Sequence, residues 1–189
     1  MRWERLFADL EAQLAAGERR ELDDEVAERT RRERALVTLD ARLASAVGTP
    51  VVLGLVEGGP GGARRVQGDL ADLGDGWVLL RAPAGRDLLV PLAAVATVGA
   101  LAPSAGPGAP AAARRFGLGH ALRALSRDRA TVAVRLRGGG APLVGTIDAV
   151  GADHLDLAEH PEGMPRRREH VTTTTTVATA ALLVVESRR

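Results

Sequence analysis

The first residues of the chain alternate apolar and charged side chains at the spacing of a helix. Apolar residues recur at every third or fourth position, which puts them on one stripe, while Glu and Arg fill the other face. The stripe consists of Trp3, Leu6, Phe7, Leu10 and Leu14. The sequence therefore predicts an N-terminal amphipathic helix whose stripe is a candidate docking surface, either for a partner or second chain or for the rest of this one.

After Gly17 the helical pattern continues but becomes much more polar. Leu22 and Val26 are among its few apolar residues, and charged residues run on to about position 34, with i,i+4 pairs such as Glu28 and Arg32. This stretch has too little apolar surface to be buried, so we expect it to project or to pair with another chain. Residues 1–35 are therefore assigned to a helical segment.

From about residue 36 the chain consists of short apolar runs and glycines, and one pattern occurs twice. Residues 68–80 align on residues 145–157 without a gap, at an offset of 77. The shared pattern is Gly-x-apolar-x-x-apolar-Gly-x-x-x-apolar-x-Leu. A recurrence of this length indicates a repeated structural unit.

The segments around the two copies also correspond. Each copy follows a short helix candidate, an apolar strand candidate and a glycine cluster, and each precedes a second apolar stretch. In the first unit these four segments are 40–47, 51–56, 58–62 and 90–98. In the second unit they are 119–127, 132–136, 138–140 and 177–185. Residues 101–113 are rich in Pro, Gly and Ala, a composition typical of a linker. We therefore predict units at 36–100 and 114–189.

This order of elements, with Val-Pro-Leu-x-x-Val at residues 90–95, resembles the Sm-like, SH3-type small barrel. From Met1-Arg2-Trp3-Glu4 onward the chain is also similar to a group of uncharacterised actinobacterial proteins, which implies no activity. The resemblance implies an α+β fold, in which an N-terminal amphipathic helix is followed by two repeated Sm-like small β-barrels, each preceded by a short helix.

The resemblance does not extend to the base-binding pocket of RNA-binding Sm proteins. Those proteins carry an Asp in the first signature block, where this chain has Gly74 and Gly151. They carry an Arg-Gly pair in the second block, where this chain has Pro91-Leu92 and Ala178-Thr179. The resemblance therefore implies the fold without the pocket.

Composition narrows the classes of function. The chain has no cysteine, which excludes disulfide scaffolds, Cys-ligated zinc sites and thiol catalysis. The longest apolar stretch, 88–102, is too short and too broken by Pro91 and Gly99 to span a bilayer. No signal-peptide pattern is visible at the N-terminus, so we expect a cytoplasmic protein without a membrane partner.

Positive charge is concentrated in residues 114–137, although the net charge of the chain is only +1. The arginines of this stretch face a single acidic residue, Asp128: they are Arg114, Arg115, Arg123, Arg127, Arg129, Arg135 and Arg137. Such a cluster could bind phosphate, so a nucleic-acid-binding regulator is one hypothesis. Aromatic residues are nearly absent, however, which leaves no stacking platform for single strands.

No catalytic, cofactor-binding or metal-binding set is visible. No two of the four histidines, His120, His154, His160 and His170, have the His-x-x-x-His spacing of a helical metal site. No serine lies in Gly-x-Ser-x-Gly, and the glycine clusters lack the Lys-Ser/Thr of a phosphate loop.

The threonine run at residues 172–176 predicts an extended strand, because β-branched residues fit a pleated surface. On an exposed edge this strand would be prone to pairing, so we expect a neighbour or a second chain to cover it.

The favoured interpretation is a non-enzymatic, cytoplasmic interaction or scaffold protein. It would use its N-terminal helix and barrel surfaces to bind protein partners or to self-associate. Nucleic-acid binding through the arginines of residues 114–137 is the alternative.

Overall fold

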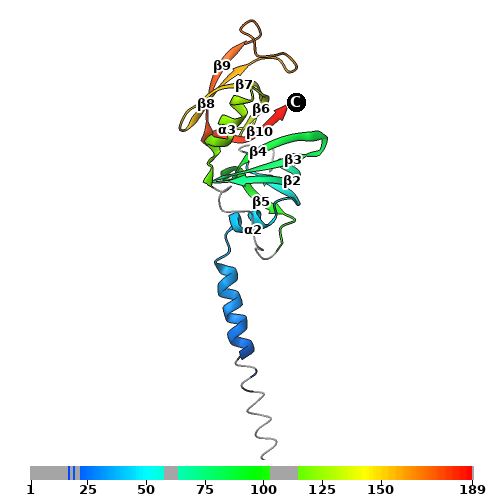
Figure 1. Cartoon of the computed structure of the whole chain (residues 1–189), viewed down its shortest axis with the longest axis vertical. Helices are drawn as coiled ribbons and strands as arrows, with labels where there is room; N and C mark the ends of the chain where they lie inside the picture. The colour runs from blue at the N-terminus through cyan, green and yellow to red at the C-terminus, as the bar shows by residue number, and fades with distance from the viewer. Residues whose placement is uncertain (1–16, 18, 20–21, 58–63, 103–114, 189) are drawn as a thin grey trace, which may run out of the picture. The chain divides into compact units, whose positions relative to one another are not determined.

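The computed structural model of the chain describes residues 17, 19, 22–57, 64–102 and 115–188 (Figure 1). The chain divides into two compact units, residues 1–39 and residues 40–189. The predicted stripe of Trp3, Leu6, Phe7, Leu10 and Leu14 lies outside the described residues, as do Arg114 and all of the predicted linker except Leu101 and Ala102.

In the first unit, residues 22–35 are helical. Glu28 forms an ion pair with Arg32 at 3.2 Å, and Arg29 forms one with Glu33 at 3.3 Å, both at i,i+4 spacing. Leu22 and Val26 are 60% and 63% exposed. The helix is thus supported by side-chain pairs along its own surface, and its few apolar residues are not covered within the described part of the chain.

The second unit is built on one antiparallel sheet of ten strands, in the order β5-β1-β2-β3-β4-β10-β6-β7-β8-β9. The strands are β1 (Pro50–Leu55), β2 (Arg64–Gly74), β3 (Trp77–Ala82), β4 (Arg86–Pro91), β5 (Val95–Gly99), β6 (Thr131–Leu136), β7 (Leu143–Val150), β8 (His154–Glu159), β9 (Thr173–Ala178) and β10 (Leu182–Arg188). Two α-helices, α2 (Leu39–Ser45) and α3 (Leu118–Arg127), precede β1 and β6. Short 3₁₀ turns η1 (Pro83–Gly85), η2 (Leu92–Ala94) and η4 (Thr179–Ala181) connect strands that follow one another in the chain.

The predicted fold class, a helix followed by two Sm-like barrels, is wrong, because the strands of both halves belong to one open sheet. Strand β10 pairs with β6 on one side and with β4 on the other, where Val185 lies opposite Leu89. Leu88 and Leu89, which point to opposite faces of β4, are both buried. Strand β4 pairs with β3 along one edge, and β10 supplies the hydrogen-bonding partner along the other.

The two halves of the sheet nevertheless have the same internal order, β5-β1-β2-β3-β4 and β10-β6-β7-β8-β9. The register between β2 and β3 shifts between Leu70 and Asp72, and that between β7 and β8 shifts between Ile147 and Ala149, 77 positions later. A Cβ at Gly68 would lie 2.5 Å from the carbonyl oxygen of Arg81, so glycine is needed at that position for the close approach of β3.

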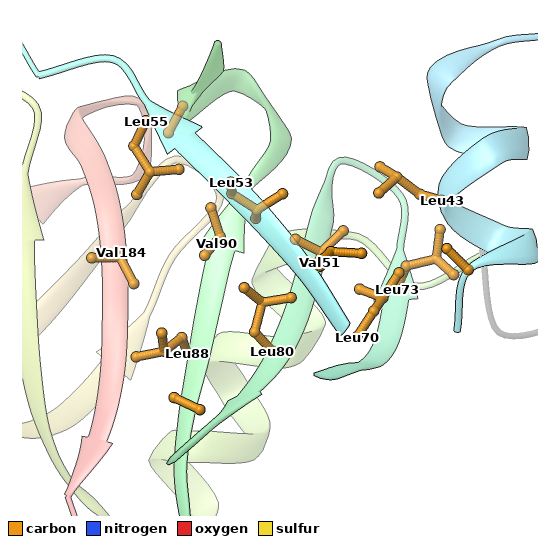
Figure 2. Packing of buried hydrophobic residues seen from close by; sticks show 14 of the residues in the cluster. Leu43, Val51, Leu53, Leu55, Leu70, Leu73, Leu80, Leu88, Val90 and Val184 are labelled. Atoms are coloured by element: carbon orange, nitrogen blue, oxygen red, sulfur yellow. The ribbon is translucent and has the colours of Figure 1, made fainter. Parts of the chain in front are cut away.

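Buried side chains form two clusters. The first consists mainly of residues of α2, β1–β4 and β10, and it includes Leu88, Val90 and Val184 (Figure 2). The second is formed mainly by α3 and β6–β10, and it includes Leu89 and Val185. Strands β4 and β10, which we call the seam, therefore contribute to both clusters and couple the two halves. No helix in the described part of the chain is long and apolar enough to span a bilayer.

Candidate functional site

The two ends of the sheet are strand edges without a partner strand in the described residues. Strand β9 pairs only with β8, and β5 pairs only with β1. The threonine run does form a strand, as the sequence predicts, and β9 begins at Thr173. The cover that we expected on this strand is absent from the described part of the chain, where Thr173, Thr174 and Thr176 are exposed.

On β9 the outward backbone groups belong to Thr174, Thr176 and Ala178. The amide of Thr179 donates to the carbonyl oxygen of Asp153 at 2.7 Å, which fixes the alternation of bonded pairs between β8 and β9. Bonded pairs then recur at Val177 and Thr175. The residues between them direct their N–H and C=O groups away from β8, toward the free edge.

On β5 the outward backbone groups are those of Val98. Strand β1 pairs Gly99 with Val52 and Thr97 with Gly54. Val51, Leu53 and Leu55 of β1 direct their backbone groups to β2, so Val52 and Gly54 direct theirs to β5. The pairs of Val52 with Gly99 and of Gly54 with Thr97 are therefore the hydrogen-bonded ones. Val98 lies between them, and its N–H and C=O therefore point away from β1.

A second candidate site, the arginine pocket, is a cavity of about 250 Å³ that crosses the seam. Three arginines from different strands line it, Arg64 of β2, Arg86 of β4 and Arg135 of β6. One carboxylate is present, that of Glu186 on β10, which accepts a hydrogen bond from Arg86 at 2.6 Å. Apart from these residues, the lining consists of Val66, Gln67, Ala82, Pro83, Leu88 and Val184.

The arginines predicted to bind nucleic acid do not all lie on one face. Those on or near α3 are exposed: Arg115, Arg123, Arg127 and Arg129. Val132 and Val134 of β6 pack in the cluster that contains Leu122 of α3, so strand alternation places Arg135 on the opposite face of the sheet. Arg137 follows β6 and donates through Nε to the carbonyl oxygen of Leu182 at 3.3 Å. The sequence grouped Arg135 with the helix, whereas the structure places it with Arg64 and Arg86.

A third candidate site is a cavity of about 370 Å³ between α3 and the sheet. Trp77, Leu79 and Leu89 line it from the sheet. The indole Nε1 of Trp77 donates to the carbonyl oxygen of Phe116 at 2.7 Å, and the Phe116 ring stacks on His120 with centroids 4.3 Å apart. These contacts attach the start of the second half to the first half. The groove also contains the carboxylates of Asp72 and Asp128.

Two further histidines, His160 and His154, have structural contacts. His160 is buried, and its Nε2 lies 3.0 Å from the hydroxyl of Thr146. The hydrogen bond between His154 and Asp153, 2.9 Å long, raises the pKa of the imidazole and lowers that of the carboxyl. Within the described residues, no three His, Asp or Glu side chains are grouped so that they could hold a metal ion.

Comparison with known proteins gives no match of this chain to a protein-family model, to a curated protein or to a solved structure.

Proposed function

We propose that the protein is a non-enzymatic interaction protein that self-associates, with β9 of one copy pairing with β5 of the next. The observation that carries this proposal is the seam. Strands β4 and β10 occupy the places in the two halves that β9 and β5 occupy at the ends of the sheet. The chain thus already contains one junction of the type that two copies would form.

The seam also supplies a register for the junction between copies. Within the chain, Val185 lies opposite Leu89 and Glu186 lies opposite Leu88. The apolar stretches 90–98 and 177–185 are offset by 87 positions. At this offset Val185 and Glu186 correspond to Val98 and Gly99 on β5, and Leu89 and Leu88 correspond to Thr176 and Thr175 on β9. Val98 and Thr176 are residues whose backbone groups point outward, so this register would pair free donors with free acceptors.

A junction between copies would be weaker than the seam. The seam buries Leu88, Leu89, Val184 and Val185, and burial of one such side chain contributes about 1.5–3 kcal/mol. The corresponding residues at the ends are Thr175, Thr176, Thr97 and Val98, so three of the four aliphatic side chains are replaced by threonine. We therefore expect reversible association with a dissociation constant of about 1 μM or weaker.

The geometry of the junction determines what kind of assembly forms. Each copy uses two different edges, so association is head to tail and gives rings or open chains rather than a dimer with two-fold symmetry. A copy with one blocked edge can still bind through the other edge, and it would then terminate a growing chain.

The test is analytical ultracentrifugation of the full chain over a concentration series. Thr176→Pro removes the outward N–H at the centre of the junction without removing a backbone bond to β8, and proline is tolerated on edge strands. It is expected to weaken association about tenfold or more. Added to the unmodified protein in equal amount, it is also expected to shorten the assemblies by capping them.

Thr176→Val is the matched control. It removes the same hydroxyl, which donates to Asp156 at 2.6 Å, but it keeps the backbone N–H, so association should persist. Leu10→Glu, in the predicted N-terminal stripe, separates helix-driven association from edge pairing. A monomeric mass at all concentrations contradicts the proposal, and so does association that Leu10→Glu abolishes and Thr176→Pro leaves intact.

A further inference from the structure

The residues that line the arginine pocket carry an excess of positive charge. Its lining contains three arginines and one carboxylate, which gives a formal charge of +2. Arg86 is paired with Glu186. Arg64 forms a long ion pair with Glu57, at 3.8 Å, compared with the length of about 2.7–2.9 Å that is typical of a charge-assisted hydrogen bond.

Arg135 gives a second and independent indication. Its Nε is buried and has no hydrogen-bond partner in the described part of the chain. A buried N–H without an acceptor is unfavourable, so a small shift of the Arg135 side chain that lets an acceptor reach Nε would recover the lost interaction. Arg135 is opposite Val184 in the pairing of β6 with β10, and Val184 also lines the pocket.

The size and walls of the pocket limit what that acceptor can be. Its volume of about 250 Å³ is several times the roughly 30 Å³ that one water molecule occupies in the liquid, so it holds a small polyatomic group. Guanidinium groups bind carboxylate and phosphate through paired N–H donors. Donors that approach from three strands suit a tetrahedral group with several oxygens better than a planar carboxylate with two.

We propose that the arginine pocket binds a phosphate monoester group. A monoester carries a charge of about −1.5 to −2 at neutral pH, which complements the formal +2 of the lining. Arg64 and Arg135 donate to its oxygens, while Arg86 bridges it to Glu186. The apolar residues Val66 and Leu88 contact the part of the ligand that carries the phosphate. The site is separate from the β5 and β9 edges, so it does not depend on self-association.

Isothermal titration calorimetry of the full chain at constant ionic strength tests the site, with methyl phosphate, inorganic phosphate and acetate as probes. Methyl phosphate is expected to bind saturably with a dissociation constant of about 1 mM or below, and acetate at least tenfold more weakly. Arg135→Gln is expected to weaken methyl phosphate binding about ten- to hundredfold, the effect of one lost charge-assisted hydrogen bond. Arg64→Gln, a change on the β2 side of the pocket, is expected to act in the same direction.

Arg123→Gln is the matched control, because it removes the same charge from the exposed face of α3. It is expected to leave binding unchanged. Three results would overturn the proposal: no saturable heat with methyl phosphate, equal binding of acetate, or an equal loss in the Arg123 and Arg64 variants, which would indicate non-specific attraction. Binding of inorganic phosphate without methyl phosphate would also overturn it, because the site would then take the free anion only.

Discussion

Leucine-to-alanine substitutions on the two sides of the seam are expected to destabilise one and the same folding unit. Leu53 on β1 belongs to the first buried cluster, and Leu157 on β8 belongs to the second. Both side chains are 0% exposed. If β4 and β10 couple the clusters as the structure indicates, neither cluster can unfold while the other stays intact.

The size of the effect follows from burial. Replacing a fully buried leucine with alanine costs about 2–5 kcal/mol, because contacts are lost and a cavity is left. For a unit of about 150 residues, each kcal/mol lowers the melting temperature by roughly 2–4 °C. A central cost of about 3 kcal/mol therefore gives a decrease of about 6–12 °C for either variant.

Differential scanning calorimetry of the full chain measures this effect. A single transition is expected, and both variants should shift it as a whole. Leu36→Ala is the control, because Leu36 is 81% exposed and the change should cost less than about 0.5 kcal/mol. Two transitions, one lowered only by Leu53→Ala and the other only by Leu157→Ala, would refute the coupling and would indicate two independent halves.

Two further outcomes are expected from local contacts. The hydrogen bond and the negative charge of Asp153 raise the pKa of His154 above 6.5, so NMR titration should show that Asp153→Asn lowers this pKa. Because the folded-state pKa is raised, protonated His154 favours the folded state at low pH, and this contribution is lost as the pH rises through the raised pKa. An unchanged His154 pKa in the Asp153→Asn variant would contradict Asp153 as the cause of the raised pKa. Gly68→Ala is expected to cost about 1–3 kcal/mol in urea denaturation, because the new Cβ would lie 2.5 Å from the carbonyl oxygen of Arg81. Gly99→Ala is the control, since the nearest atoms to its Cβ would be 3.7 Å away, and equal losses in the two variants would show that close packing is not the cause.

Local pattern was enough to place most individual elements. The apolar runs at 51–56 and 132–136 correspond to β1 and β6, and the helix candidate at 119–127 corresponds to α3. These elements follow from residue spacing and from glycine positions, which act over a few residues. The apolar stretch at 90–98 is divided in the structure into the end of β4, the turn η2 and β5.

The connection between the halves left no local signal in the sequence. Strand β10 pairs Glu186 with Leu88, nearly a hundred positions away, and nothing near either residue specifies that partner. The two buried faces of β4 are consistent both with a closed barrel and with a continuing sheet. Only the three-dimensional pairing distinguishes these alternatives, which is why the predicted pair of barrels was wrong.

The candidate sites were visible in sequence only in part. The threonine run and its tendency to pair were predicted, because both follow from β-branched residues next to one another. The arginine pocket was not, because Arg64, Arg86 and Arg135 are far apart in the chain and come together only through the sheet. Proximity in the sequence grouped Arg135 with the arginines of α3, but the alternation of side chains along β6 puts Arg135 on the opposite face of the sheet.

The proposed junction between copies can be tested most directly by disulfide cross-linking, because the chain has no cysteine of its own. In the register transferred from the seam, Gly99 of one copy lies opposite Thr175 of the next in a non-hydrogen-bonded pair, with Cα atoms about 4.5 Å apart, within disulfide range. A mixture of the Gly99→Cys and Thr175→Cys variants should therefore form a mixed disulfide under mild oxidation. Gly99→Cys mixed with Thr174→Cys should not, because Thr174 points to the other face of β9. Equal cross-linking of the two mixtures, or none in either, would contradict edge-to-edge assembly.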